Sequence, residues 1–234
     1  MLTIEKSVRT KPAKRPGLLV EKYRPATLGE LRGQDNAVKF LKNFACSPYP
    51  VALLLSGETG TGKTSAALAL AAELGCDVDE GAYGGVYSIA SGEQNAAGVR
   101  ECCDKTWLSP MLGSGWKVMI VNECDRMNLQ AETIWLDQLE RIAPRTVFIF
   151  TTNEPAKLAP RFTDRCIHIS FESSSAKLLQ PVREMVSELY QKETGKAPDA
   201  LTVERIVYAS TDKDTSKMSF RRAIMSLQTA LLGA

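Results

Sequence analysis

One eight-residue stretch carries the clearest chemistry in this chain. Residues 57–64 read Gly-Glu-Thr-Gly-Thr-Gly-Lys-Thr, which fits the phosphate-binding pattern G-x-x-x-x-G-K-[ST]. Its glycines let backbone N–H groups close around phosphate oxygens at the positive end of a helix dipole. The Lys63 ammonium can reach β- and γ-phosphates, and the Thr64 hydroxyl can hold Mg²⁺. The sequence therefore predicts a nucleotide site here, the alternative being a glycine-rich turn with a chance lysine. The residues expected to contact the nucleotide are Gly57, Glu58, Thr59, Gly60, Thr61, Gly62, Lys63, Thr64 and Ser65.

A second cluster of reactive side chains follows an apolar run at 117–121. Asn122 and Glu123 come directly after this run, in the arrangement called Walker B. There a carboxylate at the strand tip supports the Mg²⁺ shell and the next one activates water. Asn122 offers an amide oxygen without charge, and Glu123 is the candidate general base. An acidic turn at a strand end is the alternative.

Two further polar residues are associated with other predicted strands. One comes just after a strand and the other lies within one. Asn153 comes just after the run 146–151, where it could hydrogen-bond a γ-phosphate or the lytic water, or could simply begin the turn before Pro155. His168, the only histidine, lies in an alternating segment with no nucleophile or metal partner near it in sequence. A structural role is the favoured interpretation for His168.

The elements that would position these residues can be read from hydrophobic periodicity. The phosphate loop lies between an apolar run of strand length and a strong helix former, which is the context that the motif needs. The segment 20–28 is expected to be extended because of Pro25, and Tyr23 and Pro25 could form a wall of an adenine pocket or simply pack. The predicted strands are 51–55, 86–90, 117–121, 146–151 and 166–171, and the predicted helices are 34–45, 65–74, 94–105, 129–142, 176–193, 199–210 and 219–232.

The order of these elements predicts two domains. Strands alternate with helices as far as residue 171, and only helices follow. We expect an α/β phosphate-loop domain over 18–171 and a small all-helical lid domain over 172–234. Residues 1–17 are strongly basic and read as a solvated, disordered leader, with an arm that touches nucleic-acid phosphates as the less favoured interpretation.

Composition narrows the class of protein to which the chain can belong. Hydrophobic residues make up 44% and charged residues 24%, as in ordinary globular proteins, and the net charge of +2 is too small to indicate nucleic-acid binding by itself. The six cysteines show neither a CxxC pair nor zinc spacing, which favours reduced, mostly buried thiols. The sequence contains no membrane-length apolar run and no signal-peptide core, so a cytosolic protein is expected.

Taken together, these motifs resemble the clamp-loader branch of AAA+ ATPases, the small subunits of replication factor C and their bacterial and phage counterparts. The most family-specific part is Val-Glu-Lys-Tyr-Arg-Pro at 20–25, followed by Leu28 and by Gly33-Gln34, and the match extends over about residues 18–232. The resemblance implies an AAA+ domain with a five-stranded parallel sheet between helices, followed by a helical lid. It also implies an ATPase that loads a sliding clamp on DNA for replication.

The resemblance assigns roles to individual residues. Asn153 matches the family's sensor 1, and Arg165 within 163–166 resembles the arginine that reaches a neighbouring subunit's ATP. Arg221 within 219–224 resembles the sensor 2 arginine, which contacts the γ-phosphate. Val20 and Arg32 correspond to positions lining the adenine site.

Cofactors and partners follow from the same resemblance. ATP and Mg²⁺ are the implied cofactors, with Mg²⁺ on Thr64 and, weakly, Asn122. The implied partners are like or related AAA+ subunits in a pentamer-like assembly, a sliding clamp, and the DNA phosphate backbone through Arg100 and Arg126. No membrane partner is expected, and the implied location is the cytoplasm of a bacterial or phage-infected cell, or the nucleus of a eukaryotic one.

Three departures from the family pattern leave alternatives open. Asn122 stands where aspartate is usual, and Asp164 precedes the arginine finger, with which it could pair. This sequence also ends after the lid, so it does not contain the family's third domain, a helical collar. The chain is then expected to be a shortened member, a truncated one, or one whose assembly rests on the ATPase domains and another protein. The alternatives are another AAA+ ATPase of DNA metabolism, of the branch-migration or recombination type, and a catalytically impaired ATP-binding structural subunit.

Overall fold

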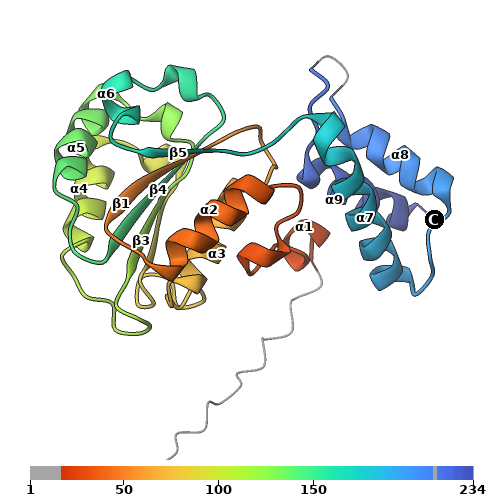
Figure 1. Ribbon diagram of the computed structural model, residues 1–234, viewed down its shortest axis with the longest axis horizontal. Helices are drawn as coiled ribbons and strands as arrows, with labels where there is room; N and C mark the ends of the chain where they lie inside the picture. Colours follow the sequence, from red (N-terminus) through yellow and green to blue (C-terminus); the bar gives the residue numbers. More distant parts are fainter. Residues whose placement is uncertain (1–16, 213–214, 234) are drawn as a thin grey trace, which may run out of the picture.

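A computed structural model describes residues 17–212 and 215–233. The predicted leader lies outside the described residues except for Gly17. A unit of sheet and helices lies beside a second unit made of helices alone (Figure 1).

The sheet has five strands, all parallel, in the order β2-β3-β4-β1-β5. Helices cover both of its faces, so the central strands are buried throughout and read as continuous apolar runs. The predicted five-stranded parallel sheet is confirmed. Its strands are β1 (Val51–Ser56), β2 (Val86–Ile89), β3 (Lys117–Val121), β4 (Thr146–Thr152) and β5 (Ile167–Ser170).

Alternate residues of the central strands β1, β3 and β4 point into two different cores. Leu53 and Leu55 of β1 pack with the helices α2 and α3 on one face, whereas Ala52 and Leu54 pack with α4 and α5 on the other (Figure 1). The helical segments of this unit are α2 (Asp35–Cys46), α3 (Lys63–Glu73), α4 (Ala96–Lys105), α5 (Leu129–Glu140) and α6 (Pro160–Thr163), with short 3₁₀ turns at Leu28–Glu30, Ser91–Glu93, Cys124–Arg126 and Pro155–Lys157.

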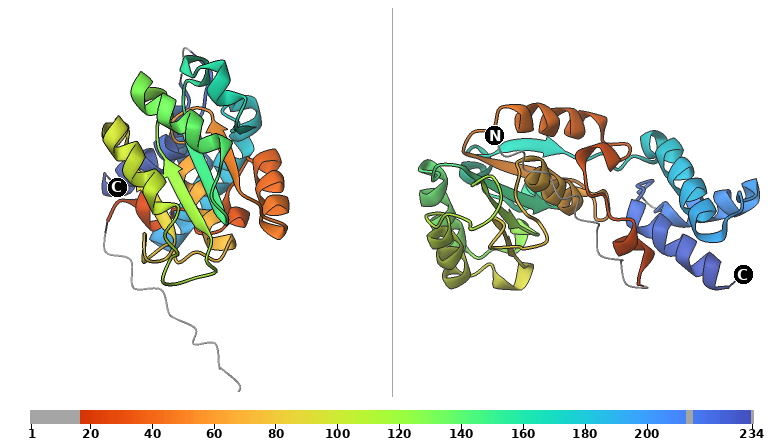
Figure 2. Two further views of the ribbon diagram at one scale, coloured as in Figure 1. Left: turned by 90° about the vertical axis from the view of Figure 1, so that its left-hand side faces the viewer. Right: turned by 90° about the horizontal axis from the view of Figure 1, so that it is seen from below.

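The predicted helical region is present after residue 174. It comprises α7 (Ser175–Thr194), α8 (Ala200–Ser210) and α9 (Phe220–Leu232), which share a third core. Seen from below, these helices stand to one side of the sheet unit (Figure 2). The expected domain boundary near residues 171–175 stays a prediction. We call the described residues between 175 and 233 the lid.

The expectation of an extended segment over 20–28 is wrong at its start. Leu19–Lys22 forms a one-turn helix, α1, because the restriction imposed by Pro25 acts only on the residue directly before it. Leu19 is buried in the lid core, and Val20 and Tyr23 pack against it. The N-terminal segment therefore contacts the lid, although the sequence analysis assigns it to the α/β domain.

Two helix starts differ from prediction by two residues, and the residue directly before each helix explains both. Helix α3 begins at Lys63, two residues early, because Gly62 takes a left-handed conformation (φ 105°) directly before it. Helix α4 begins at Ala96 because the Asn95 side chain accepts hydrogen bonds from the N–H groups of Ala97 and Gly98. The preceding Gln94 is buried instead of helical.

Within the described part of the chain, helices with the length and apolarity needed to cross a bilayer are absent.

Candidate nucleotide-binding site

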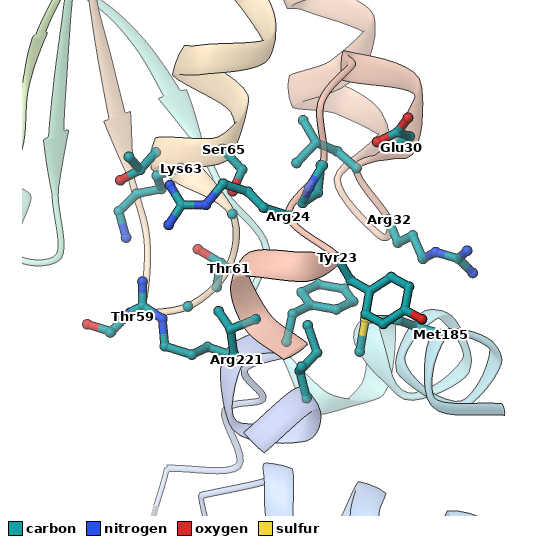
Figure 3. A pocket seen from close by; sticks show the side chains of 18 of the residues that line it. Tyr23, Arg24, Glu30, Arg32, Thr59, Thr61, Lys63, Ser65, Met185 and Arg221 are labelled. Atoms are coloured by element: carbon teal, nitrogen blue, oxygen red, sulfur yellow. The ribbon is translucent and has the colours of Figure 1, made fainter. Parts of the chain in front are cut away.

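A cavity of about 610 Å³ lies where the strand ends of the sheet meet the lid (Figure 3). It is lined by residues from the N-terminal segment, the phosphate loop, the tips of β3 and β4, and helices α7 and α9. Gly57 and Glu58 are outside this lining, although they belong to the motif. The predicted site residues that line it are Val20, Arg32, Thr59, Gly60, Thr61, Gly62, Lys63, Thr64, Ser65, Asn122, Glu123, Asn153 and Arg221.

The Lys63 side chain is a buried cation, with only 8% of the residue exposed. Its ammonium donates hydrogen bonds to the carbonyl oxygens of Gly57 (2.7 Å) and Glu58 (2.9 Å) and to Oδ1 of Asn153 (2.8 Å). Burial lowers the pKa of Lys63 to about 8; Glu58 opposes this effect, whereas the Arg221 guanidinium adds to it. A buried ammonium held by three neutral oxygens suits an anionic ligand such as phosphate.

The backbone of the phosphate loop also suits an anion. Gly60 and Gly62 have φ values of 81° and 105°, which side-chain-bearing residues rarely adopt. These conformations lead the chain into the first turn of α3, whose unpaired N–H groups provide an anion site. A Cβ at Gly60 would lie 2.2 Å from Oγ of Ser219 and 2.8 Å from Cβ of Arg221, so the loop and the lid are in close contact.

The oxygens of the two predicted metal ligands, Thr64 and Asn122, are neutral. Oγ1 of Thr64 lies 3.1 Å from Oδ1 of Asn122, and both residues line the cavity. The neighbouring carboxylate of Asp125 instead accepts a hydrogen bond from Oγ1 of Thr152 at 2.6 Å. Hydroxyl, amide and phosphate oxygens fit the ligand preference of Mg²⁺, but without a protein charge against the ion at position 122.

Glu123 lies at the tip of β3 in a left-handed conformation (φ 53°, ψ 51°). Its N–H donates to Oγ1 of Thr151 at 3.2 Å, and its carboxylate forms an ion pair with Nε of Arg126 at 3.1 Å. The amide of Gln94 donates to the carbonyl oxygens of Asn122 and Glu123, the latter at 3.2 Å. These contacts hold an unfavourable backbone conformation in place and so fix the position of the candidate base.

No local pattern in the sequence indicates the role of Gln94. It is 4% exposed, and its Oε1 is buried without a hydrogen-bond partner. A glutamine at the start of a helix is indistinguishable in sequence from a surface residue. Only the folded chain brings it beneath the backbone of Asn122 and Glu123.

One end of the cavity is formed by the N-terminal segment and the lid. Tyr23 and Met185 line it there, and Arg221 reaches from α9 toward the phosphate loop (Figure 3). The Tyr23 hydroxyl donates to Glu193, and Arg32 forms an ion pair with Glu188, both on α7. The lid residues of this wall were not predicted because α7 and α9 have the sequence pattern of ordinary amphipathic helices. They are Met185, Glu188, Leu189, Lys192, Phe220 and Ile224.

Three predicted functional arginines lie outside the cavity lining. Arg165 pairs with Glu140 (2.6 Å) and donates to the Arg161 carbonyl oxygen (2.6 Å), so its ionic partner is not the suggested Asp164. Arg126 is paired with Glu123, and Arg100 lies exposed on α4.

His168 and the cysteines lie away from the cavity lining as well. Nε2 of His168 is 2.6 Å from Oγ of Ser56, a link between β5 and β1. All six thiols are free, four of them are buried, and burial raises the pKa of Cys102 to about 12. The prediction of mostly buried thiols is confirmed.

The sequence matches known proteins over most of its length. The family model described as "ATPase family associated with various cellular activities (AAA)" matches residues 53–173. A replication factor C small subunit of Methanococcus maripaludis is 31% identical over 223 residues, which cover 90% of this chain and 64% of that protein. Replication factor C subunit 3 of Saccharomyces cerevisiae is 30% identical over 188 residues, covering 77% and 52% of the two chains. This chain thus spans just under two thirds of the archaeal relative's length, and about half of the yeast protein's.

The fold also recurs among solved structures. The Thermotoga maritima protein RuvB superposes with a TM-score of 0.69 at 17% identity, covering 91% of this chain and 68% of the other. A DNA polymerase III gamma subunit-related protein of the same organism gives 0.58 at 20% identity, covering 83% and 60%. Both likenesses concern the fold alone. The family match over half of the chain, together with the relatives at about 30% identity, shows that the chain belongs to the AAA family of ATPases, in its clamp-loader branch.

Proposed function

We propose that this chain binds ATP with Mg²⁺ in the cavity under the lid and hydrolyses it as a clamp-loader-like subunit that loads a sliding clamp on DNA. The observation that carries the proposal is the buried ammonium of Lys63. It lies in a glycine-rich loop and is hydrogen-bonded to Asn153, with Glu123 and Arg221 lining the same cavity. The replication factor C relatives support the clamp-loading part of the proposal.

The proposed site residues have separate roles in hydrolysis. The phosphate-loop amides and Lys63 bind the phosphates. Thr64 and Asn122 would hold Mg²⁺, which neutralises charge on the phosphates when bound. Glu123 accepts a proton from the attacking water, Asn153 orients that water, and Arg221 contacts the γ-phosphate from the lid.

Completion of the site by a neighbour is part of the proposal. Arg165 would leave Glu140 and enter the site of an adjacent AAA+ subunit in a pentamer-like assembly.

DNA phosphates would contact Arg100 and Arg126. Substitution of both arginines should therefore flatten the salt dependence of DNA binding, and an unchanged dependence would reject them. The sites of action would be the bacterial or phage-infected cytoplasm, or the nucleus.

Nucleotide binding to the full chain tests this proposal. We expect a fluorescent, non-hydrolysable ATP analogue to bind the wild type and to lose at least about a hundredfold in affinity with Lys63→Ala, because a buried charge-assisted contact is removed. Lys39→Ala, an exposed lysine of α2, is the matched control and should bind normally. Equal affinities of all three proteins would refute the assignment of the site.

A second function, that of an ATP-binding structural subunit with damped hydrolysis, is favoured by the neutral Asn122. Asn122→Asp separates the two functions in an ATPase assay with partner subunits and DNA. A rise of about tenfold or more would identify the natural site as damped, since an added ligand charge strengthens Mg²⁺ binding. An unchanged rate would identify an active ATPase that tolerates asparagine.

A further inference from the structure

The phosphate loop is joined to the lid by an ion pair that the nucleotide motif does not require. Oε1 of Glu58, the second residue of the loop, pairs with Nζ of Lys217. Lys217 lies four residues before Arg221, and the Arg221 N–H donates to the Gly60 carbonyl oxygen at 3.4 Å. The two contacts connect the same short stretches of loop and lid.

We propose that Lys217 is a positioning residue for the nucleotide site: through Glu58 it holds the start of α9 against the phosphate loop, so that Arg221 is in place over the phosphates. This role rests on the proposed function of the cavity. Neither Glu58 nor Lys217 lines the cavity, so the pair acts through Gly60 and Arg221.

The backbone around Lys217 is held from two sides. The Met218 N–H donates to the Ser173 carbonyl oxygen at 2.8 Å, and the Ser175 N–H donates to that of Ser216 at 3.1 Å. Lys217 and Met218 also form isolated antiparallel bridges, to Ser174 and to Thr211 respectively. The side chain therefore starts from an ordered backbone that is tied both to the connection before α7 and to the end of α8. Only the side-chain rotamers remain to be ordered when the pair forms.

The packing beside the ion pair explains why a weak interaction can affect the position of Arg221. Since a Cβ at Gly60 would collide with Ser219 and Arg221, the lid already touches the loop there. Helix α9 begins at Phe220, and Oγ of Ser219 accepts from the Arg222 N–H as its N-cap. A small displacement of this segment would carry both the helix start and the Arg221 side chain away from the phosphates.

The side chains of Lys217 and Glu58 are 45% and 39% exposed, so solvent weakens the attraction between them. Measured exposed pairs correspond to changes of about fivefold or less in an equilibrium constant. We therefore expect each of Lys217→Gln and Glu58→Gln to weaken nucleotide binding by about two- to fivefold. Salt should reduce the difference, because the Debye length falls to about 3 Å at 1 M.

A double-mutant cycle tests the pair on the full chain. The affinity for a fluorescent, non-hydrolysable ATP analogue is measured for the wild type, both single variants, the double variant, and the charge exchange Glu58→Lys with Lys217→Glu. The double variant should bind no worse than either single one, and the exchange should restore affinity toward that of the wild type. Lys196→Gln removes the same charge from an exposed lid position and is the matched control. Thermal unfolding of every variant shows that folding is intact.

The outcomes distinguish this role from simple attraction of phosphate by a lysine. If Lys217→Gln costs the same affinity with Glu58 present or replaced, the positioning role is overturned. Unchanged affinity in both single variants overturns it as well. A wild type that does not bind nucleotide rejects the proposed function and this role with it, whereas a binding wild type with additive variants rejects this role alone.

Discussion

At the scale of single residues, the cavity has an unusual distribution of charge. Lys63 is a cation in a buried setting, and its hydrogen-bond partners are neutral oxygens. At the proposed metal position, Asn122 supplies an oxygen but no negative charge. The phosphates of a bound nucleotide would therefore provide the anionic charge for both Lys63 and a metal ion. Nucleotide affinity should accordingly depend on the protonation of Lys63.

The pH dependence of binding follows from the lowered pKa of Lys63. In the free protein this pKa is about 8, and a bound phosphate would raise it by stabilising the ammonium. Below the free pKa the lysine is already charged, so affinity should be constant with respect to this group. Above it the protein must take up a proton on binding, and affinity should fall by up to about tenfold per pH unit.

Calorimetry in buffers of different ionisation enthalpy measures this proton directly. We expect almost no proton uptake by Lys63 near pH 7 and an uptake approaching one proton well above the free pKa. Lys63→Arg keeps its charge throughout this range and should lack the transition. The same alkaline loss of affinity in Lys63→Arg would assign the effect to another group.

At the scale of elements, the sequence was most informative where local chemistry decides the structure. The strand–loop–helix unit around 57–64 was predictable because glycines and apolar runs act over neighbouring residues. Thr64 meets Asn122, and Lys63 meets Asn153, because each of these residues comes soon after a parallel strand and the carboxyl ends of those strands lie at one edge of the sheet.

The remaining part of the site depends on contacts between distant segments. Helix α1 joins the lid core, and the Gln94 amide reaches the backbone of Glu123, without any local signal for either. The pairing of Lys217 with Glu58 likewise requires the lid to fold back on the loop. Periodicity identifies the buried face of a helix but not the segment against which it packs.

The close approach of loop and lid gives a prediction for Gly60→Ala. An alanine there would face Ser219 at 2.2 Å in a backbone conformation with φ of 81°. The left-handed conformation alone costs about 1–2 kcal/mol for a residue with a Cβ, and the lid must also move. We expect nucleotide affinity to fall by about tenfold or more and hydrogen exchange to increase at residues 216–221.

Gly92→Ala is the matched control for this substitution. A Cβ at Gly92 meets nothing within 4 Å, and its φ is not positive. Affinity and exchange should therefore match the wild type. If Gly60→Ala behaved like Gly92→Ala, the lid would not contact the loop in solution as it does here.

At the scale of the whole molecule, the chain's own cavity contains the proposed site groups other than the candidate arginine finger. Arg165 is outside the cavity lining, in an ion pair with Glu140. An arginine supplied in trans raises phosphoryl-transfer rates by about 10³–10⁵. We therefore expect the isolated monomer to bind ATP but to hydrolyse it slowly, with turnover rising steeply when like subunits assemble around it.

Arg165→Ala tests the origin of that acceleration. In the assembled state the variant should lose about a thousandfold or more of the ATPase rate, while nucleotide affinity of the monomer stays unchanged, because Arg165 contacts no residue of its own cavity in the described structure. Arg161→Ala, on helix α6 four residues before Arg165 and paired with Glu132, is the control for loss of a nearby charge. Rapid turnover by a verified monomer would show that the chain completes its own site. Arg165 would then be a surface arginine whose role is to hold α6 against Glu140 of α5.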